Sequence, residues 1–207
     1  MRRAPPDRGM LVIVVGASGV GKDSLLAAAR EAFAGREDIR FQRRVVTRAA
    51  DAANEPHESV DEATFERRRR AGHFAIDWQA HGLHYGIPVT TIDALAEGRV
   101  VVVNGSRKAL PRFATRFPRR HIVHVTVSPE TLARRLRARG RESEAAIAER
   151  LERRIDPASF DGPLWQLDND GMLDDAAARL IDWLDALSRD IAGTASGARP
   201  AALPTAP

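Results

Sequence analysis

The sequence predicts an α/β fold in which helices cover a parallel β-sheet. Three apolar, β-branched runs, residues 10–15, 100–103 and 122–127, have the composition of strands that are buried on both faces. Segments with helical spacing lie between these runs, as in βαβ units, where a helix joins two parallel strands. The 207 residues, 43% of them hydrophobic, are the size of one domain with one continuous core.

The elements of this core follow one another in a regular order. The first strand, Met10–Val15, ends at a glycine, and Ser24–Phe33 then has apolar residues at helical spacing. Val100–Val103 and Ile122–Val127 are the next predicted strands. From about Leu173 to Leu187, apolar residues recur at core-facing intervals, which predicts a helix packed across the sheet.

Two long segments interrupt the predicted core. The first, about Arg40 to Leu95, is rich in charge, histidine and glycine, and is predicted to form an inserted subdomain. The second, Pro129 to Arg154, contains two basic helical stretches that are broken at Gly140. This second segment is predicted to form a mobile helical lid.

The chain ends differ in composition from the core. Residues 1–9 and 192–207 are rich in Pro, Ala, Gly and Ser, so we expect flexible tails around a single domain at 10–191. The longest apolar run, Met10–Val15, is far shorter than the roughly 20 residues that span a bilayer. Residues 1–9 also lack the hydrophobic stretch of a secretory signal. We therefore expect a cytoplasmic protein without membrane contact.

Composition excludes some chemistry and leaves the partner open. The chain has no cysteine, which excludes disulfides, thiolate nucleophiles and thiolate zinc sites, and its six histidines form no metal-ligand pattern. The net charge is +4, and 30 of the 32 basic residues are arginine, so arginine clusters carry little weight. The run Arg67–Arg70 therefore indicates a solvated helix face rather than a nucleic-acid patch. The positive charge suits an anionic ligand, and we expect no nucleic-acid partner.

A glycine-rich motif joins the first strand to the first helix. Glycines let successive backbone N–H groups point inward, and with the helix N-terminus these groups form a cavity for the β- and γ-phosphates of ATP. The motif ends in a lysine, which adds a positive charge for the transferred phosphoryl group. The alternative is a plain strand-to-helix turn, but strand, spacing, lysine and helix all agree with a phosphate loop. The predicted ATP-binding residues are Gly16, Ala17, Ser18, Gly19, Val20, Gly21 and Lys22.

The position after the lysine departs from the usual pattern. A serine or threonine there normally supplies a hydroxyl to Mg²⁺, but this chain has Asp23, and Ser24 follows one place later. Many phosphate-loop proteins have an acidic residue at a strand end, where this chain has Asn104. We expect that the negative charge has moved from the strand end to the loop, and that Asp23 and Ser24 bind Mg²⁺.

Two motifs together resemble one enzyme family. Gly21–Ser24 and Trp78–Gly86 are similar to segments of the ribose 1,5-bisphosphate phosphokinases, which belong to the guanylate-kinase-like group. The resemblance covers about Met10 to Leu187. It implies a P-loop kinase sandwich with a parallel sheet core, an inserted acceptor-binding subdomain and a helical lid. It also implies ATP-dependent conversion of ribose 1,5-bisphosphate to phosphoribosyl diphosphate, in bacterial phosphonate breakdown.

The resemblance also assigns an acceptor site within the insertion. Arg44 and Arg48 match acceptor-phosphate arginines, and Tyr85 matches an acceptor-site tyrosine. Histidines stand at His57 and His84, where guanylate kinases have tyrosines, so the set that reads guanine is incomplete. This pattern favours an acceptor with phosphates and no base. The roles of two further residues are left undecided. Trp78 either contacts the acceptor or lies in the core, and His81 is a candidate acceptor contact.

The lid and the last strand complete the predicted site. By resemblance, Arg135, Arg139 and Arg150 approach the phosphates when the lid closes and stabilise charge on the transferring group. Arg135 and Arg139 are four residues apart and share a helix face, although an arginine-rich surface helix is the alternative. Asn169 is in a segment that resembles the loop packed on adenine, or in a plain turn.

Three rival functions are weighed against the sugar-phosphate kinase, and one of them, a nucleic-acid-binding protein, is supported only by the basic isoelectric point. A guanylate kinase would convert GMP to GDP, and the two enzymes differ in the acceptor that turns over. A non-catalytic binding module with the same fold should lack the loop lysine, and Lys22 argues against it. The oligomeric state is left open by the sequence.

Overall fold

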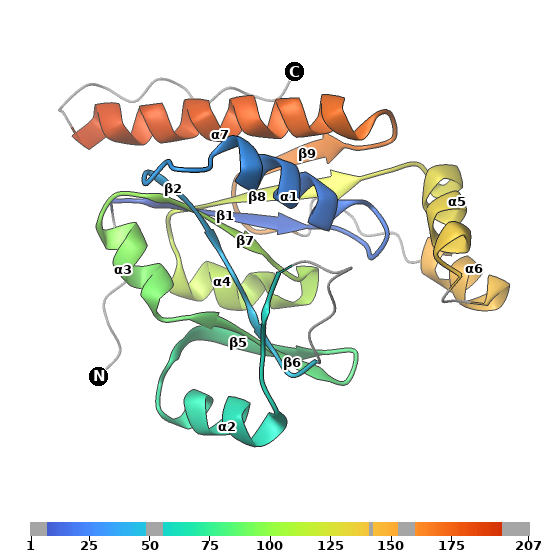
Figure 1. The fold of residues 1–207 in the computed structure, drawn as a ribbon, viewed down its shortest axis with the longest axis horizontal. Helices are drawn as coiled ribbons and strands as arrows, with labels where there is room; N and C mark the ends of the chain where they lie inside the picture. Colours follow the sequence, from blue (N-terminus) through green and yellow to red (C-terminus); the bar gives the residue numbers. More distant parts are fainter. Residues whose placement is uncertain (1–7, 49–55, 141–142, 153–159, 196–207) are drawn as a thin grey trace.

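The computed structural model describes residues 8–48, 56–140, 143–152 and 160–195, with the side chains of residues 150, 152, 194 and 195 left undescribed (Figure 1). The strands are β1 Met10–Val15, β2 Ile39–Gln42, β3 Val45–Val46, β4 Glu58–Ser59, β5 Phe74–Ala80, β6 Leu83–Pro88, β7 Val100–Asn104, β8 Arg120–Thr126 and β9 Leu164–Asp168. The helices are α1 Lys22–Ala32, α2 Glu62–Arg70, α3 Thr90–Ala96, α4 Leu110–Arg116, α5 Pro129–Arg139, α6 Glu144–Glu152 and α7 Leu173–Ala195, with a 3-10 turn, η1, at Arg107–Ala109.

The core is a five-stranded sheet in the order β2-β7-β1-β8-β9, and every neighbouring pair is parallel. Helices α1 and α7 lie on one face of this sheet, and α3 and α4 lie on the other (Figure 1). The predicted α/β fold with a parallel sheet core is therefore confirmed. Because parallel strands share a direction, their carboxyl ends meet at one edge, and α5 lies beyond that edge.

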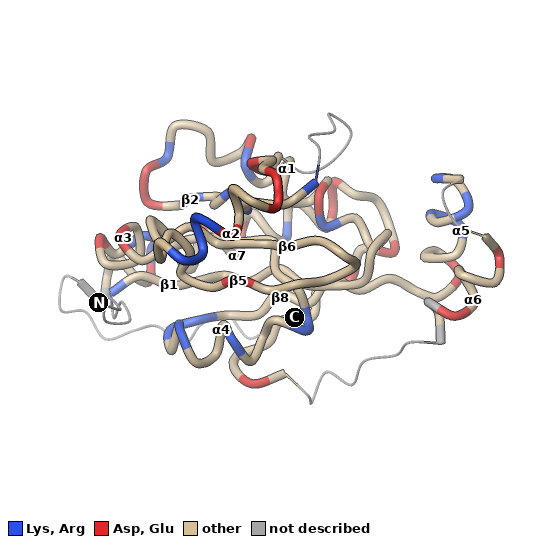
Figure 2. The backbone as a smooth tube through the Cα atoms, turned by 90° about the horizontal axis from the view of Figure 1, so that it is seen from below, with Lys and Arg blue, Asp and Glu red and all other residues tan. Residues whose placement is uncertain are grey.

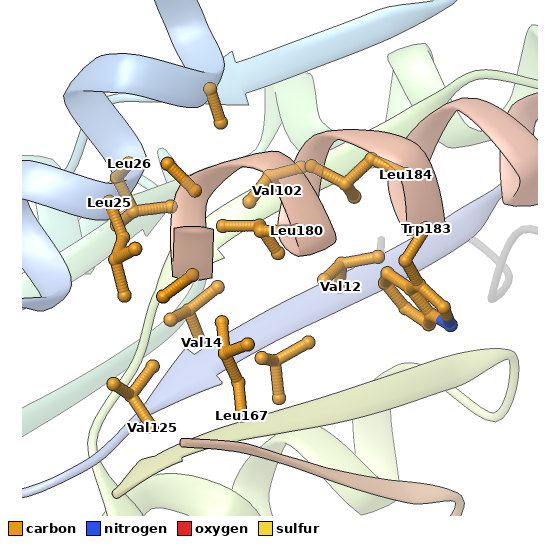
Figure 3. Close-up of a cluster of buried hydrophobic side chains, with 14 of the residues drawn as sticks. Val12, Val14, Leu25, Leu26, Val102, Val125, Leu167, Leu180, Trp183 and Leu184 are labelled. Atoms are coloured by element: carbon orange, nitrogen blue, oxygen red, sulfur yellow. The ribbon is translucent and has the colours of Figure 1, made fainter. Parts of the chain in front are cut away.

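The central strand β1 is buried on both sides because its side chains alternate between two apolar clusters. Val12 and Val14 pack with α1 and α7, including Leu180 and Leu184, in the cluster that Figure 3 shows. Leu11, Ile13 and Val15 face the opposite cluster, with α3 and α4. A continuous apolar run is what such a strand requires, since neither of its faces meets water.

The inserted segment forms a second sheet in the order β4-β3-β6-β5, with α2 beside it. The predicted start of the insertion, about Arg40, was too early, because Ile39–Gln42 forms strand β2 and pairs with β7 in the core sheet. Strands β5 and β6 form a hairpin whose two turn residues, His81 and Gly82, both have positive φ, at 52° and 72°. This backbone matches the twist of the paired strands.

A row of stacked side chains ties the inserted sheet to the core. Trp78 of β5 pairs directly with Tyr85 of β6, and their rings stack at 5.3 Å. The ring of Trp78 also lies 6.0 Å from that of Phe113 in α4. Trp78 is only 5% exposed, so of the two alternatives the core position describes it. The second sheet is thereby held against α4 through aromatic contacts.

The predicted lid region consists of α5 and α6, with Gly140 in the left-handed conformation at the end of α5. Leu132 and Leu136 of α5 are buried in the core cluster, so the first turns of this region pack on the main body. Residues 192–195 had been expected in a disordered tail but form the last turn of α7. At the other end, Gly9 donates a backbone hydrogen bond to Leu95.

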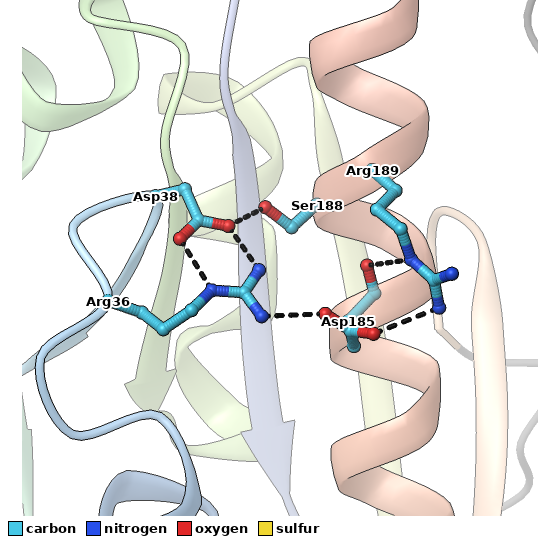
Figure 4. Close-up of polar contacts among 5 residues, drawn as sticks. All are labelled: Arg36, Asp38, Asp185, Ser188 and Arg189. Atoms are coloured by element: carbon cyan, nitrogen blue, oxygen red, sulfur yellow. Dashed lines mark hydrogen bonds and ion pairs between the residues drawn. The ribbon is translucent and has the colours of Figure 1, made fainter.

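A polar network fixes the loop between α1 and β2 against α7 (Figure 4). Arg36 donates to both carboxylate oxygens of Asp38 and, at 2.7 Å, to Asp185 of α7. The hydroxyl of Ser188 donates to Asp38 at 2.5 Å. The bond from Arg36 is the main cause that holds the pKa of Asp38 below its ordinary value, with a further contribution from Ser188.

The surface charges are partly paired. Figure 2 shows basic and acidic segments interspersed along the chain. At the end of α2, Arg68 pairs with Glu58, while Arg69 and Arg70 both pair with Glu66. These pairs fit the solvated helix face expected for the arginine run. None of the helices in the described ranges has the length and apolar character required to cross a membrane.

Candidate active site

The phosphate loop leaves the carboxyl end of β1 and enters α1 at Lys22. Gly19 and Gly21 have φ values of 99° and 95°, a region that side chains other than glycine rarely adopt. A Cβ on Gly19 would also lie 3.0 Å from Leu132 and Leu136 of α5. The ammonium of Lys22 donates to the carbonyl oxygens of Gly16 and Ala17, each at 2.9 Å. The lysine thus lies across the mouth of the loop.

Two side chains hold the backbone of the phosphate loop. The amide nitrogen of Asn169, which follows β9, donates to the carbonyl of Val20 at 2.7 Å. The guanidinium of Arg135 donates to the same carbonyl at 3.2 Å and to the carbonyl of Asn169 at 2.9 Å. The position of Gly21 has no room for a side chain, because a Cβ there would lie 2.4 Å from the amide of Asn169. Asn169, predicted as an ATP-binding residue, is buried and holds the loop backbone.

The loop after β9 also fixes the start of α5. Asp170 accepts hydrogen bonds from the backbone N–H and the hydroxyl of Ser128, at 3.0 and 2.9 Å, and Ser128 caps the N-terminus of α5. Hydrogen bonds from Thr131 and then from Ser128 lower the pKa of Asp170. The helix that carries Arg135 is therefore anchored to the same loop that carries Asn169.

Asp23 and Asn104 meet at the carboxyl ends of two neighbouring strands. Val14 of β1 pairs with Asn104, the last residue of β7, which brings that strand end beside the phosphate loop. The amide nitrogen of Asn104 donates to Oδ1 of Asp23 at 3.0 Å. Asn104 is buried, whereas Asp23 and Ser24 are exposed in the first turn of α1.

The donor atoms at this position suit a magnesium ion. The carboxylate of Asp23 and the hydroxyl of Ser24 are hard oxygen ligands, and one oxygen of Asp23 is already oriented by Asn104. Across the described residues, no cluster of three or more His, Asp or Glu side chains is able to hold a metal. Magnesium commonly binds through one or two protein oxygens together with substrate phosphates, and this site has that limited set.

Sequence reasoning missed a buried histidine at the same edge of the sheet. His124 of β8 lies beside Val15 of β1, and it is buried. Burial, and then the charges of Arg107 and Lys22, lower the pKa of His124 to about 4. The imidazole is therefore neutral near pH 7. A histidine inside the otherwise apolar strand 122–127 was the signal that would have pointed to it.

The predicted acceptor residues gather on the inserted sheet. The guanidinium of Arg44 lies over the ring of Tyr85, 5.4 Å from its centre. His57 precedes β4, and the next residue, Glu58, donates its N–H to the carbonyl of Arg44 at 2.8 Å. These contacts bring Arg44, Tyr85 and His57 to the same part of the inserted sheet.

His84 lies on β6 with partners of its own. Its Nε2 is 3.5 Å from Glu62, and its backbone N–H donates to the Thr47 hydroxyl at 2.9 Å. Arg48 is half-buried and directly precedes the undescribed residues 49–55. His81 is exposed in the hairpin turn. The two histidines therefore differ in their surroundings, because His81 lies at the tip of a turn and His84 is held on a strand.

The predicted lid arginines differ in their contacts. Arg135 is half-buried and bound to the phosphate loop through Val20, whereas Arg139 is exposed one turn later on α5. Arg150 belongs to α6, but its side chain lies outside the described part of the structure. Of this predicted trio, the structure therefore brings Arg135 to the loop.

Comparisons with known proteins give a matching family model and sequence relatives of one enzyme type. A family model described as an AAA domain matches residues 12–156. A ribose 1,5-bisphosphate phosphokinase of Rhizobium etli is 45% identical over 188 residues, which is 91% of this chain and 95% of that protein. The same enzyme of Pseudomonas paraeruginosa is 49% identical over 177 residues, or 85% and 95% of the two chains.

A solved structure shares the fold. The guanylate kinase of Anaplasma phagocytophilum matches with a TM-score of 0.62 over 87% of each chain, at 20% sequence identity. At this identity the likeness concerns the fold alone.

Proposed function

The chain belongs to the ribose 1,5-bisphosphate phosphokinase family, and we propose that it transfers a phosphoryl group from ATP to ribose 1,5-bisphosphate, giving 5-phosphoribosyl 1-diphosphate. The observation that carries this function is the family membership, which extends over nine-tenths of the chain. The chain is thus a kinase, and its phosphate loop retains the glycines and the lysine that a kinase needs.

The reaction needs little covalent chemistry from the protein. An oxygen of the acceptor phosphate attacks the γ-phosphorus of ATP, the bond from that phosphorus to the β–γ bridging oxygen breaks, and ADP leaves. Because the attacking oxygen is already ionised, no strong general base is required. The task of the protein is to position two anions and to neutralise their charge.

The phosphate loop binds the donor in this proposal. Backbone N–H groups of residues 16–22 point at the β- and γ-phosphates, and the ammonium of Lys22 follows the transferred group. Support comes from the position of Lys22 over the carbonyls of Gly16 and Ala17 and from the braces at Val20. A loop held in this way is preorganised, so little reorganisation is needed when charge develops.

Magnesium, which kinases of this type commonly use, would be held by Asp23 and Ser24. When bound, the ion neutralises charge on the β- and γ-phosphates. Asn104 orients the carboxylate of Asp23 through the 3.0 Å hydrogen bond, so the ligand has a defined direction before ATP arrives.

The inserted sheet holds the acceptor in this proposal. The residues proposed to contact ribose 1,5-bisphosphate are Arg44, Arg48, His57, His81, His84 and Tyr85. Arginine suits phosphate because its planar guanidinium donates two parallel hydrogen bonds. The position of the Arg44 guanidinium over the ring of Tyr85 supports the role, since it holds this cation beside a second proposed acceptor residue.

The lid arginines close the site over the reacting phosphates. We assign Arg135, Arg139 and Arg150 to this positive clamp, which also excludes water from the transferring group. The contact of Arg135 with Val20 supports the assignment, because it already places one member against the phosphate loop.

The choice of acceptor tests the function. Purified protein with Mg-ATP is offered ribose 1,5-bisphosphate or GMP at equal concentration, and products are followed by phosphorus NMR. We expect a new diphosphate resonance from the sugar phosphate and almost no GDP, because a site with an incomplete set of guanine-reading groups leaves polar atoms of a bound guanine without partners. Robust GDP formation with inert ribose bisphosphate would instead identify a guanylate kinase.

A further inference from the structure

A stack of side chains runs from the proposed acceptor residues of the inserted sheet to a helix of the core. The guanidinium of Arg44 lies over the ring of Tyr85, 5.4 Å from its centre. The ring of Tyr85 lies 5.3 Å from that of Trp78, with an angle of 6° between the two planes. Trp78 in turn lies 6.0 Å from the ring of Phe113 in α4. The cation at one end of the stack is therefore connected to the core at the other end.

Trp78 is the member that joins the two parts of the molecule. It is 5% exposed and belongs to the apolar cluster of β1, α3 and α4, in which Phe113 is fully buried. Tyr85 lies directly opposite Trp78 in the antiparallel pair of β5 and β6, and its ring is parallel to the indole. With so little exposed surface, Trp78 is not a contact for the acceptor. Any influence on the acceptor must pass through Tyr85.

A polar contact fixes the same junction. Arg112, the neighbour of Phe113 on α4, donates to the backbone carbonyl of Asp77, the neighbour of Trp78, at 2.5 Å. The Arg112 guanidinium is also 3.8 Å from the Asp77 carboxylate. Figure 1 shows β5 and β6 below this helix. Strand β5 is thus held to α4 at two adjacent residues.

The place of this stack matters because the two substrates bind to different parts of the fold in the proposed function. ATP lies on the phosphate loop of the core, whereas Arg44 and Tyr85 belong to the inserted segment. A misplacement of reacting groups by about 1 Å can cost about 10²-fold in rate. Stacked aromatic rings have preferred geometries, and an aromatic face attracts a cation. The stack therefore provides a physical means of fixing Arg44 with respect to the core.

We propose that Trp78 is a positioning residue for the acceptor: it holds Tyr85, and through Tyr85 the guanidinium of Arg44, in a fixed place relative to the core. This role rests on the proposed function, in which Arg44 binds a phosphate of the acceptor. Loss of Trp78 leaves both acceptor residues in the chain and removes the support beneath them. The phosphate loop contains no member of the stack, so ATP binding should be independent of it.

The test compares Trp78→Leu, Trp78→Phe and Trp183→Leu with the wild type. Trp183 is a matched control, because it is also a buried tryptophan, 8% exposed, but packs with Trp165 in the cluster on the other face of the core sheet. Calorimetry measures the affinity for ribose 1,5-bisphosphate, and steady-state kinetics measure the KM of each substrate. We expect Trp78→Leu to weaken acceptor binding and raise the acceptor KM by about 10-fold, the scale of one aromatic pair. The KM of ATP should not change.

The other two variants separate positioning from stability. Trp78→Phe should lie between Trp78→Leu and the wild type, because it keeps a ring against Tyr85. Trp183→Leu should lower the melting temperature and leave both KM values unchanged. A role of Trp78 in stability alone would lower the melting temperature without distinguishing the two substrates.

A double-mutant cycle tests whether Trp78 acts through Arg44. Arg44→Ala removes the group that Trp78 positions, so adding Trp78→Leu should then have little further effect on the acceptor KM. Equal effects of Trp78→Leu with and without Arg44 would overturn the role. If Trp78→Leu does not fold, Arg112→Ala changes the same junction at a side chain that is 62% exposed and should raise the acceptor KM in the same direction. Wild-type acceptor binding in both Arg112→Ala and Trp78→Phe would also overturn it.

Failure of the role and failure of the function give different results. If Trp78→Leu binds ribose 1,5-bisphosphate as tightly as the wild type, or Trp183→Leu weakens that binding equally, the role of Trp78 is overturned. If the wild type uses GMP instead, the proposed function fails alone. The same cycle with GMP, whose phosphate is then the acceptor group, decides on Trp78. A wild type that binds neither compound overturns both.

Discussion

The amide of Asn104 donates a hydrogen bond to the carboxylate of Asp23 at 3.0 Å, and so joins the end of β7 to the first turn of α1. An amide is the complementary partner for a carboxylate at this distance, whereas a second carboxylate would repel it. The sequence led us to expect the acidic group at Asp23 of the loop rather than at Asn104 of the strand end. In the structure these two positions are in direct contact. The contact leaves the second oxygen of Asp23 available as a ligand.

Asp23→Ala should raise the magnesium concentration needed for half-maximal activity by about 10- to 100-fold, because one oriented oxygen ligand is lost. The affinity for ATP at saturating magnesium should change much less. A magnesium titration of the rate at fixed ATP measures the first quantity, and the KM of ATP at high magnesium measures the second. An unchanged magnesium titration would count against Asp23 as a ligand.

Returning a carboxylate to the end of β7 should restore part of the magnesium binding that is lost when Asp23 is replaced. In an Asp23→Ser background, Asn104→Asp places the acidic group where other phosphate-loop proteins have it, next to a hydroxyl at the usual loop position. We expect the double variant to need less magnesium than Asp23→Ser alone. A double variant that is worse than both single variants would show that the two positions do not share one role.

Lys22→Ala should lower the rate of transfer by about 10²–10³-fold or more, because a preorganised charge on the transferred phosphoryl group is removed. Its hydrogen bonds to the carbonyls of Gly16 and Ala17 lie at a partly exposed loop, where water can replace them. The melting curve should therefore stay close to that of the wild type. Wild-type turnover in a folded variant would remove the phosphate-loop assignment.

Substitutions of Arg135 and Arg139 should differ in their effect on stability but not in the direction of their effect on kcat. Arg135→Ala removes hydrogen bonds to the carbonyls of Val20 and Asn169, which should cost about 1–2 kcal/mol in the free energy of unfolding. Arg139→Ala, at an exposed position, should change it by less than about 0.5 kcal/mol. Both variants should lower kcat if both arginines contact the closing phosphates. Urea unfolding and initial rates measure the two effects, and equal stability of the variants would contradict the brace at Arg135.

The network at Asp38 should make the free energy of unfolding depend on pH in the acidic range. Arg36 and Ser188 lower the folded-state pKa of Asp38 below its ordinary 3.8, so the stabilisation is present above that pH and is lost as the pH falls below it. Asp38→Asn should therefore be less stable than the wild type near neutral pH, by about 1 kcal/mol or less for this half-exposed pair. The difference should shrink below about pH 4.

Urea unfolding at a series of pH values tests this linkage. Asp182→Asn, an exposed position on the same helix α7, serves as the matched control and should show no such trend. A difference between Asp38→Asn and the wild type that stays constant down to pH 3 would mean that the charge of Asp38 does not stabilise the fold.

Local sequence was sufficient for the central strands and the phosphate loop. Met10–Val15 is predicted and observed with the same bounds, because a strand buried on both faces needs an unbroken apolar run. The loop that follows carries its own signal, since only glycine tolerates the backbone at Gly19 and Gly21. Strand β2 escaped notice because Ile39–Gln42 has two polar side chains in four and lies at the edge of the sheet.

The rest of the site depends on which strands are neighbours. By itself, the sequence determined the fold class, the phosphate loop and the candidate carboxylate at Asp23, because composition and spacing along the chain encode them. Only the tertiary structure placed Asn169 against Val20, 149 residues away, and placed His124 beside Val15 at the end of β1. The physical reason is the strand order β2-β7-β1-β8-β9, which is set by packing of the whole sheet and decides which strand ends lie beside the phosphate loop.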